Sequence, residues 1–498
     1  MQTLIRAALL VILPAAGAHA AFDPNNPPQG LFDDSYYAVE LQGQKCGYAR
    51  IAARREGDVI RTLNFTSIKI KRGPTPIEII VKNVHLETLD GRALGFESEQ
   101  YTGLMTVKQE GIIRDGKLTL TSTQGGQVTT QTYDWNPDAL LAWGSYLFMH
   151  RRGLHVGDRF ELLTYDASVR PDAPIKTQMT VLAREPVELL GSKVEAFRVD
   201  TTLDLGMQLT STSWLREDGV PLISTMELAF LKLRMLRCPK QFAMQDLAPP
   251  ELLVSTLVRA DRPLDGRTAK RIVFRLSLPP GSEPLDFPTT SMQRIVARKA
   301  NSVDLEVRRA PLPEAASRRA SSADPALVPY LASTLYLKHD DPAIRQLAEQ
   351  ARAGETQPSR IAANLCRFVS REITTKDLSI GFATASEVAK TRQGDCSEHA
   401  VLLAALARAC GIPSRVAMGI VHVDRALGRQ DVFGYHMWTQ VHLAGGWYDL
   451  DSALHQIECD PTHIALDVSD LADATLTNLA LRLLPAIGQL KIQVLSVD

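Results

Sequence analysis

The stretch that decides the fold is RQGDCSEHAVLLAALARACGIPSRV, residues 392–416. In it, Cys396 follows a Gly-Asp pair and heads an apolar run that Gly411 and Pro413 end. Such a run predicts a buried helix with the cysteine in its first turn. The N–H groups there stabilise a thiolate, so the pKa of the thiol falls below about 8.5, and they can also bind an oxyanion. We interpret Cys396 as a nucleophile; the alternative is an inert buried thiol.

Two further segments bring a base and an acid toward this helix. GYHMWTQVHL, residues 434–443, continues from His436 with alternating apolar positions. GGWYDLDSA, residues 445–453, places Asp451 at the end of a second short run after a Gly-Gly turn. Alternation on both sides of a short turn predicts a β-hairpin. The hairpin sets His436 beside Asp451 and presents both to the start of a helix.

Thiol acyl transfer needs these three residue types together. Sulfur attacks a carbonyl carbon, an imidazole takes and returns a proton near neutral pH, and a carboxylate fixes the ring tautomer and stabilises its charge. A lone histidine or aspartate is more often structural. The interpretation of Cys396, His436 and Asp451 as a catalytic triad therefore rests on their joint spacing.

At these residues the sequence resembles the transglutaminase-like superfamily. Members share a G-D-C-x-E helix start, a G-I-P turn followed by R-x-x-x-G, an H-x-W strand and a W-x-x-x-D strand. The counterparts stand in the same order: Gly394, Asp395, Cys396 and Glu398, then Gly411, Ile412 and Pro413 with Arg415 and Gly419, then His436 and Trp438, then Trp447 and Asp451. The resemblance spans residues 335–466 and implies a papain-like helix packed on an antiparallel sheet, with Cys396, His436 and Asp451 as the triad.

The resemblance also implies a reaction class, in which a thioester forms from a glutamine side chain or a peptide bond of a protein or peptide substrate. If water resolves the thioester, the enzyme is a cysteine protease or amidase; if a lysine amine does, it is a cross-linking acyltransferase. Two departures leave the substrate preference open: Gln440 stands where many members have an acid, and Ser452-Ala453 replaces Pro-Thr. A non-catalytic exported binding protein on the same fold is the alternative function.

Other polar and aromatic residues of this half receive structural interpretations. Asp395 and Glu398 are expected to be first-turn acids of the helix. Trp438 and Trp447 either pack in the core or wall the acyl site. The residues interpreted as structural or left unassigned are Cys366, Cys410, His399, His442, His455 and His463. No ligand-pair spacing supports a metal site, and no cofactor is expected.

The first half of the chain, residues 21–258, predicts a β-rich domain. Apolar and polar residues alternate along short runs that turn signals separate, as antiparallel hairpins require. The runs are 62–70, 77–89 and 193–205, and the turns are Asp90-Gly91, Asp115-Gly116 and Asp218-Gly219. An amphipathic stretch at 137–150 predicts one helix. The domain is either a scaffold or a binding module that uses an exposed sheet edge.

The second half begins with a small β unit and a linker, residues 259–324, of which 313–324 are polar and rich in Ala, Ser and Arg. Residues 325–498 carry helical patterns, one opened by Asp341-Pro342 and one at 359–373, before the motifs described above. The expected fold class is α+β, a papain-like C-terminal domain preceded by β-rich domains. The linker composition predicts that residues 325–498 fold as a separable unit.

The first twenty residues predict a signal peptide. Arg6 precedes an apolar run, and the small residues of Ala18-His19-Ala20 form a cleavage signal. The run is shorter than the roughly 20 residues that a bilayer span requires, and no later stretch stays apolar long enough. The protein is therefore expected to be secreted or periplasmic, without a transmembrane segment.

The overall composition narrows the class of partner. Lys and Arg number 55 and Asp and Glu 56, for a formal net charge of −1, so the total favours neither nucleic acid nor an anionic membrane. Six cysteines are too few and too scattered for a disulfide scaffold or a zinc module. If one is the nucleophile, an odd number is left, among which Cys46 with Cys238 is one conceivable pair. The oligomeric state is not indicated.

Overall fold

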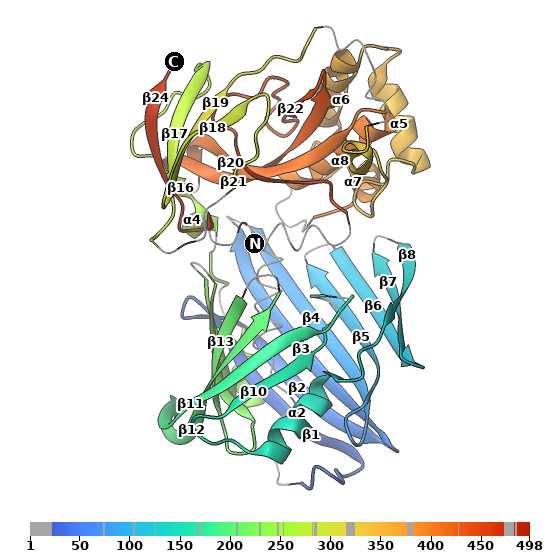
Figure 1. The fold of residues 1–498 in the computed structure, drawn as a ribbon, viewed down its shortest axis with the longest axis vertical. Helices are drawn as coiled ribbons and strands as arrows, with labels where there is room; N and C mark the ends of the chain where they lie inside the picture. Colours follow the sequence, from blue (N-terminus) through green and yellow to red (C-terminus); the bar gives the residue numbers. More distant parts are fainter. Residues whose placement is uncertain are drawn as a thin grey trace. The chain divides into compact units, whose positions relative to one another are not determined.

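The computed structural model divides into two compact units, Met1–Glu251 and Leu252–Asp498 (Figure 1). The residues that it describes are 22–72, 75–102, 105–124, 126–166, 169–170, 172–205, 208–228, 231–246, 249–251, 253–280, 282, 286–314, 324–375, 382–426, 428–472, 483 and 486–498. The expected signal peptide at 1–20 and most of the expected linker lie outside these residues. Each unit is described by itself.

The first unit is one 15-stranded sheet in which neighbours in sequence are neighbours in space. Strand β1 also pairs with β15, so the sheet runs from β8 through β1 and β15 to β9, and all pairs are antiparallel except β9 with β10. The strands are β1 (Gly30–Leu41), β2 (Gln44–Glu56), β3 (Val59–Arg72), β4 (Thr75–Thr88), β5 (Ala93–Thr102), β6 (Met105–Arg114), β7 (Lys117–Gln124), β8 (Gln127–Asp134), β9 (Ala139–Leu140), β10 (Arg159–Thr164), β11 (Ile175–Leu189), β12 (Ser192–Asp204), β13 (Gln208–Leu215), β14 (Pro221–Leu228) and β15 (Leu231–Cys238). The β-rich first half and its three predicted runs are confirmed.

A helix packs on this sheet where the sequence predicts one, but its start differs from the prediction at 137–150. Helix α2 (Ala142–Arg152) begins later because residues 139–140 pair with β10 as β9. The carboxylate of Glu87 on β4 accepts the N–H groups of Trp143 at 2.7 Å and Gly144 at 2.8 Å, which caps the first turn. A long-range contact, absent from the local pattern, therefore fixes the helix start. A short helix, α3 (Lys240–Ala243), follows β15.

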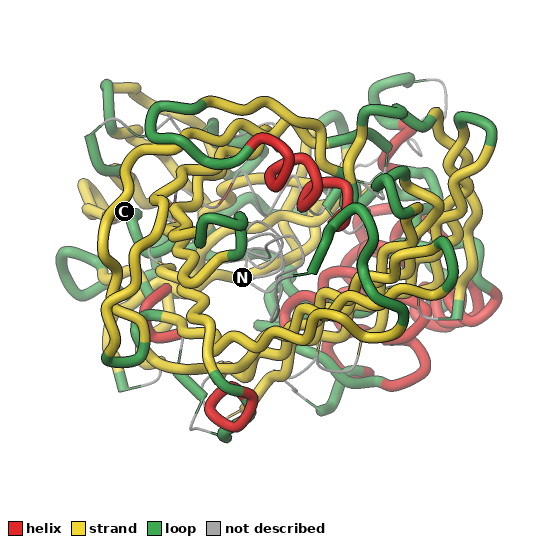
Figure 2. Tube along the Cα trace, turned by 90° about the horizontal axis from the view of Figure 1, so that it is seen from below, coloured by secondary structure: helices red, strands yellow, loops and turns green. Residues whose placement is uncertain are grey.

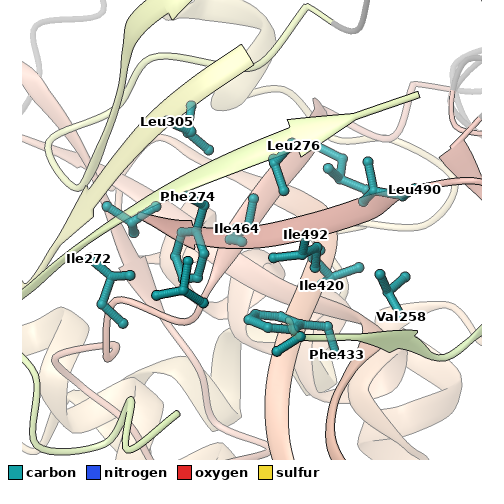
Figure 3. Close-up of a cluster of buried hydrophobic side chains, with 14 of the residues drawn as sticks. Val258, Ile272, Phe274, Leu276, Leu305, Ile420, Phe433, Ile464, Leu490 and Ile492 are labelled. Atoms are coloured by element: carbon teal, nitrogen blue, oxygen red, sulfur yellow. The ribbon is translucent and has the colours of Figure 1, made fainter. Parts of the chain in front are cut away.

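The second unit contains two sheets that share one apolar core. A five-stranded sheet has the order β16 (Val258–Arg259), β21 (Arg429–Leu443), β20 (Ser414–Ala426) and β23 (Ile464–Ser469), with β22 (Gly446–Leu450) paired to β21. A four-stranded sheet has the order β18 (Gln293–Lys299), β19 (Ser302–Arg308), β17 (Arg271–Ser277) and β24 (Lys491–Val497). Figure 3 shows Phe274 and Ile492 of the second sheet beside Ile420 and Phe433 of the first, in one buried cluster.

This core joins residues that the sequence assigned to different units. Phe274 on β17 lies opposite Val494 on β24 in the antiparallel ladder. The small β unit expected at 259–324 therefore shares its sheet with the C-terminal strand, and the structure groups it with the residues that follow. Whether residues 325–498 fold alone stays a prediction.

Helices gather on one part of the second unit (Figure 1). They are α5 (Pro342–Arg352), α6 (Pro358–Glu372), α7 (Ala385–Thr391) and α8 (Cys396–Ala409), with the single turns α4 (Leu253–Thr256) and η1 (Val328–Tyr330) before them. Asp341 caps α5 through the N–H of Ala343 at 2.8 Å, and Pro342 opens the helix as predicted. Helix α7 was not predicted, although Thr384 and Glu387 form a capping box at its start.

The described residues are mostly strand, drawn yellow in Figure 2. The α+β description accordingly rests on helices α5 to α8 of the second unit. In the described part of the chain, no helix combines the length and the apolar character needed to cross a bilayer.

Candidate active site

Cys396 is the first residue of α8, at the helix start that the sequence predicts. Asp395 is the N-cap, and its Oδ1 accepts the N–H of Ser397 at 3.0 Å. In return, Glu398 Oε2 accepts the N–H of Asp395 at 3.0 Å, which completes a capping box. The two acids thus fix the helix start, as interpreted from the sequence, and hold the thiol at the positive end of the helix dipole.

The position before this cap requires glycine for steric reasons. Gly394 has φ of 152°, and a Cβ there would lie 2.2 Å from Cβ of Glu398. Glu398 is fully buried, and its Oε1 accepts the N–H of Ala383 at 2.9 Å, which ties α8 to the segment before α7. Burial, reinforced by the negative charge of Asp395, raises the pKa of Glu398 to about 8. The G-D-C-x-E pattern is therefore a packing unit around one buried acid.

His436 and Asp451 meet through the predicted hairpin. Strands β21 and β22 pair with Thr439 opposite Leu450, which carries Asp451 back along the strand toward His436. His436 Nε2 lies 2.7 Å from Asp451 Oδ2. Since Nε2 faces the carboxylate, Nδ1 is the ring nitrogen left to exchange a proton with a thiol.

Helix α8 packs against this hairpin one turn beyond the cysteine. The Thr439 hydroxyl donates to the carbonyl of Ala400 at 2.9 Å, and the Ser452 hydroxyl donates to the carbonyl of His399 at 3.4 Å. These carbonyls belong to positions three and four after Cys396, which share its face of the helix. The start of α8 thus lies against the hairpin, in which His436 stands in the middle of β21 and Asp451 directly follows β22.

Asp451 accepts four hydrogen bonds while fully buried. Its Oδ1 accepts the N–H groups of Ala453 at 2.8 Å and Leu454 at 3.0 Å. Its Oδ2 faces His436 and, at 3.1 Å, Nε2 of His463. Burial alone would raise the pKa of Asp451, but the two imidazoles hold it well below its usual range. The carboxylate is therefore ionised and held in one orientation.

His463 is the site residue that the sequence left unassigned. It precedes β23, and its Nδ1 lies 3.2 Å from the carbonyl oxygen and 3.5 Å from Oδ1 of Asp460. Burial lowers its pKa, but the contacts with Asp451 and Asp460 outweigh burial and raise the pKa to about 9. The pairing of β23 with β20 brings it to the site, and no local spacing signals that pairing.

Comparison with protein families matches residues 345–452 to the model of the transglutaminase-like superfamily. This segment is similar to a transglutaminase-like core. No curated protein matches the chain.

Five solved chains resemble part of this chain, and three of them follow. One is a candidate cysteine protease from Cytophaga hutchinsonii, with 12% identity, 45% of this chain and 82% of that chain covered, and a TM-score of 0.30. One is a β-barrel-like protein of a domain of unknown function from Brucella abortus, with 15% identity, coverage of 41% and 96%, and a TM-score of 0.31. One is a candidate protease from Parabacteroides distasonis, with 11% identity, coverage of 70% and 64%, and a TM-score of 0.19.

A buried tryptophan backs the two histidines of the transglutaminase-like core. Trp438 stacks on His436 with ring centroids 6.1 Å apart and meets His463 edge-on at 5.3 Å. A Cβ on Gly419 would lie 2.7 Å from the Trp438 ring and 2.0 Å from the carbonyl oxygen of Ile464. The glycine of the R-x-x-x-G pattern therefore makes room for the tryptophan. Trp438 packs in the core, which is one of the two roles expected for it.

Gln440, one of the departures from the family pattern, occupies a buried polar chain. Its Oε1 accepts from Arg415 Nε at 2.8 Å, and its Nε2 donates to Asp449 Oδ1 at 2.7 Å. The Arg415 guanidinium lies over the Trp447 ring, 4.0 Å from its centroid. An amide at position 440 accepts from the cation Arg415 and donates to the acid Asp449. An ionised carboxylate there could accept from Arg415 but could not donate to Asp449. This series of hydrogen-bonded side chains links β20, β21 and β22 and so stiffens the hairpin that carries His436 and Asp451.

The other cysteines do not share the environment of Cys396. Burial raises the pKa of Cys366 to about 12 and that of Cys459 well above its usual value. All six cysteines are free thiols in the structure. The pair considered from the sequence, Cys46 with Cys238, is therefore not formed; the Cys46 thiol instead donates to the carbonyl of Val39 at 3.5 Å.

Among the described residues, one group converges as metal ligands would. The donor atoms of His436, Asp451 and His463 lie within 4.8 Å of one another. Asp451 Oδ2, however, stands at hydrogen-bond distance from both ring nitrogens, so the atoms that would bind an ion already bind one another. We assign no metal to this group.

Proposed function

We propose that the second unit is a cysteine-dependent acyl-transfer enzyme that acts on amide bonds of a protein or peptide, either a glutamine side chain or the backbone. The observation that carries the proposal is the buried His436–Asp451 pair, 2.7 Å apart, held against the helix whose first residue is Cys396. The match of residues 345–452 to the transglutaminase-like superfamily supports the same reaction class.

In the proposed reaction, Nδ1 of His436 takes the thiol proton, and the Cys396 sulfur bonds to the amide carbon. The backbone N–H of Cys396 at the helix start stabilises the oxyanion. The C–N bond then breaks, His436 protonates the leaving ammonia or amine, and a thioester is left. Water or a primary amine attacks the thioester carbon and gives a proton to His436. The C–S bond then breaks, the carboxylic acid or the new amide leaves, and His436 returns the proton to the Cys396 sulfur. Asp451 keeps the ring in the required tautomer and stabilises the imidazolium.

Trapping the thioester tests this proposal. The full chain is incubated with a library of glutamine-containing peptides, and the mass added at Cys396 is read after rapid acid quench. We expect acylation in the native chain and none in Cys396→Ala, while Cys366→Ala keeps acylation because that thiol is buried and protonated. Release of a shortened peptide marks backbone cleavage, and release of ammonia marks attack on the side chain. Incorporation of an added primary amine separates cross-linking from hydrolysis.

The alternative is a non-catalytic binding protein, and alkylation by iodoacetamide discriminates against it. A thiolate paired with an imidazolium reacts well below the free-thiol midpoint of about 8.5. If Cys396 titrates like a free thiol, and His436→Ala leaves that curve in place, the acyl-transfer proposal is wrong. Export to the periplasm or the medium belongs to the proposal on the strength of residues 1–20; a mature chain beginning at Ala21, read by mass spectrometry, is its test.

A further inference from the structure

The inner face of the first unit holds buried polar side chains that find no hydrogen-bond partner within the described residues. Their atoms are Thr62 Oγ1, Asn64 Oδ1, Thr66 Oγ1, His85 Nδ1, Thr102 Oγ1, Gln124 Nε2 and Ser211 Oγ. They come from strands β3, β4, β5, β7 and β13 of one sheet. Native proteins rarely leave such atoms unpaired, because each gives up its bonds to water on burial. A stripe of them on one face indicates that something else bonds to them.

Three of these residues line a cavity of about 210 Å³ in the same unit, namely Asn64, His85 and Ser211. Their side chains are only 7%, 8% and 1% exposed, so bulk solvent does not satisfy them. The lining also includes apolar side chains, among them Leu162, Met179 and Leu203. The cavity therefore offers both unpaired hydrogen-bonding atoms and apolar surface.

The charges around the cavity exclude an anionic occupant. None of the described residues that line it is Lys or Arg. Burial lowers the pKa of His85 to about 4, so this ring is neutral at physiological pH. Asp166, which also lines the cavity, accepts from Asn83 Nδ2 at 3.3 Å. A carboxylate or phosphate would meet no cation here and would face one acid.

Volume sets the size of the occupant. An apolar cavity of about 150 Å³ holds benzene, so 210 Å³ corresponds to roughly eight to ten non-hydrogen atoms. The same volume would hold about seven waters. Waters alone leave the apolar side chains of the lining without a partner, whereas a molecule with one polar end and an apolar body matches both kinds of lining residue.

We propose that the cavity of the first unit binds a small neutral amphiphile, with a hydroxyl or amide head that bonds to Asn64, His85 and Ser211 and an apolar body against the leucine and methionine side chains of the lining. The first unit is then a ligand-binding module, a role independent of the chemistry proposed for the second.

Calorimetric titration of the full chain with a matched series tests the ligand class. The probes are 1-octanol, octanoate and octylammonium, which share the body and differ in the head. We expect one molar equivalent of 1-octanol to bind and to raise the thermal midpoint, and octanoate to bind at least tenfold more weakly. If octanoate or octylammonium binds more tightly than 1-octanol, the neutral class is wrong. If none of the three binds, the cavity holds waters only and the proposal fails.

Two substitutions place the binding in this cavity. Ser211→Phe fills it and should abolish 1-octanol binding, while Thr210→Phe, on the exposed face of the same strand β13, should leave binding unchanged. Asn64→Leu keeps the shape and removes one acceptor, so the affinity should fall about tenfold without loss of the fold. Equal binding by the native chain, Ser211→Phe and Asn64→Leu would show that the probe sits elsewhere.

A second inference, which rests on the proposed function, concerns His463. We infer that His463 is a positioning residue that holds Asp451 in line with His436. The residue that anchors His463 is itself held by hydrogen bonds: Asp460 accepts from Gln456 Nε2 at 2.8 Å and from the N–H of Thr462 at 3.0 Å. Gln456 pairs with the backbone of Asp451 in both directions, at 2.8 and 2.7 Å. His463 and the backbone thus hold the carboxylate from two sides.

The rate of iodoacetamide alkylation of Cys396 as a function of pH tests this role without a substrate. His463→Gln removes a cation whose ring centre lies 6.2 Å from that of His436. Less positive charge makes the thiolate less stable and the His436 imidazolium more stable, so both limbs of the profile should move to higher pH. His442→Gln, at a half-buried histidine on the same strand as His436, is the control.

The outcomes separate the two proposals. If His463→Gln folds and its profile coincides with that of the native chain, His463 is only structural. If the native chain already titrates like a free thiol, the acyl-transfer proposal itself has failed. A lower rate with unmoved midpoints also contradicts a positioning role, because the charge of His463 then does not reach the thiol–imidazole pair.

Discussion

At Asp451 both carboxylate oxygens are used, each by two donors. Oδ1 accepts two backbone N–H groups of the turn that follows, and Oδ2 accepts from two imidazoles. The carboxylate therefore has two roles: it closes the turn at 451–456, and it fixes the tautomer of His436. This double use predicts an outcome that differs from simple triad reasoning, in which an amide is a mild replacement.

Asp451→Asn should be nearly as harmful as Asp451→Ala. Whichever way the amide is turned, its NH₂ group faces two N–H donors, either those of the turn or those of the two rings. To avoid that clash, Nε2 of His436 must be unprotonated. The ring proton then lies on Nδ1, the nitrogen that should accept the proton of the Cys396 thiol. We expect the acylation rate to fall about 10²- to 10⁴-fold, measured with the peptide found by trapping. Asp424→Asn, at an exposed acid on β20, is the control. A fall of less than tenfold in the acylation rate of Asp451→Asn would contradict the description of Asp451 as a carboxylate that accepts from four donors.

The sequence alone predicted the positions of those site residues that belong to a local pattern, such as a helix start or a hairpin. Cys396 stands at a helix start that Gly-Asp and the following apolar run define, and His436 and Asp451 stand on two arms of one hairpin. His463 was missed because it reaches Asp451 only through the β20–β23 pairing. Distance in the chain, rather than weakness of the contact, separates the predicted from the unpredicted site residues.

At the scale of elements, strand β20 brings the two histidines of the site together. It pairs with β21, which carries His436, and with β23, which His463 precedes. A Cβ on Gly419 of β20 would lie 2.0 Å from the carbonyl oxygen of Ile464 on β23 and 2.7 Å from the Trp438 ring on β21. Close approach of the three strands at this glycine therefore brings the strands of the two histidines together.

Gly419→Ala should therefore destabilise the second unit. The added Cβ would lie 2.0 Å from a backbone oxygen, which cannot move without separating β20 from β23. We expect a loss of about 1–3 kcal/mol in the free energy of unfolding, read from urea denaturation. Gly434→Ala on β21 is the matched control, because its Cβ would find only Leu257 at 3.7 Å and make an ordinary contact. Equal losses for the two variants would show that close approach at Gly419 is not the cause.

The four-stranded sheet of the same unit carries its own electrostatic clamp. Glu306 on β19, 6% exposed, accepts from Arg294 on β18 and from Arg271 on β17, each at 2.7 Å. The hydrogen bonds from Arg294 and Arg271 outweigh burial and lower the pKa of Glu306 from 4.5 to about 2. One carboxylate thus links three strands.

This clamp predicts a pH dependence with a definite sign. The folded pKa lies below the unfolded one, so the stabilisation is fully present above pH 4.5 and is lost as the pH falls from 4.5 through 2. Glu306→Gln should unfold at a lower temperature than the native chain at pH 7, and the difference should shrink below pH 4.5. Glu349→Gln, at an exposed acid of α5, is the control. A difference that stays constant down to pH 2 would contradict the assignment.

For the whole molecule, the sequence predicted the secondary structure that dominates each half, whereas the strand pairs that join distant parts of the chain are seen only in the structure. Period-two alternation identified β3, β4 and β12, and capping signals identified α5. The closing of the first sheet through β1 and β15, and of the second unit through β17 and β24, depends on pairs far apart in the chain. Composition marks a linker near 313–324, yet a linker shows where the chain is open to cutting rather than where a core ends.

The last prediction follows from that distinction. A protease should cut within 313–324, as the composition indicates, but the two fragments should stay associated, because β17 on one side pairs with β24 on the other and both bury Phe274, Ile420 and Ile492. We expect the nicked protein to elute as one species in size-exclusion chromatography and to separate only in denaturant. For the same reason a chain that begins at Leu252 should fold, whereas one that begins at Pro325 should aggregate, since it leaves β24 unpaired and half of its core open. A soluble, cooperatively unfolding chain from Pro325 would instead establish residues 325–498 as an independent unit.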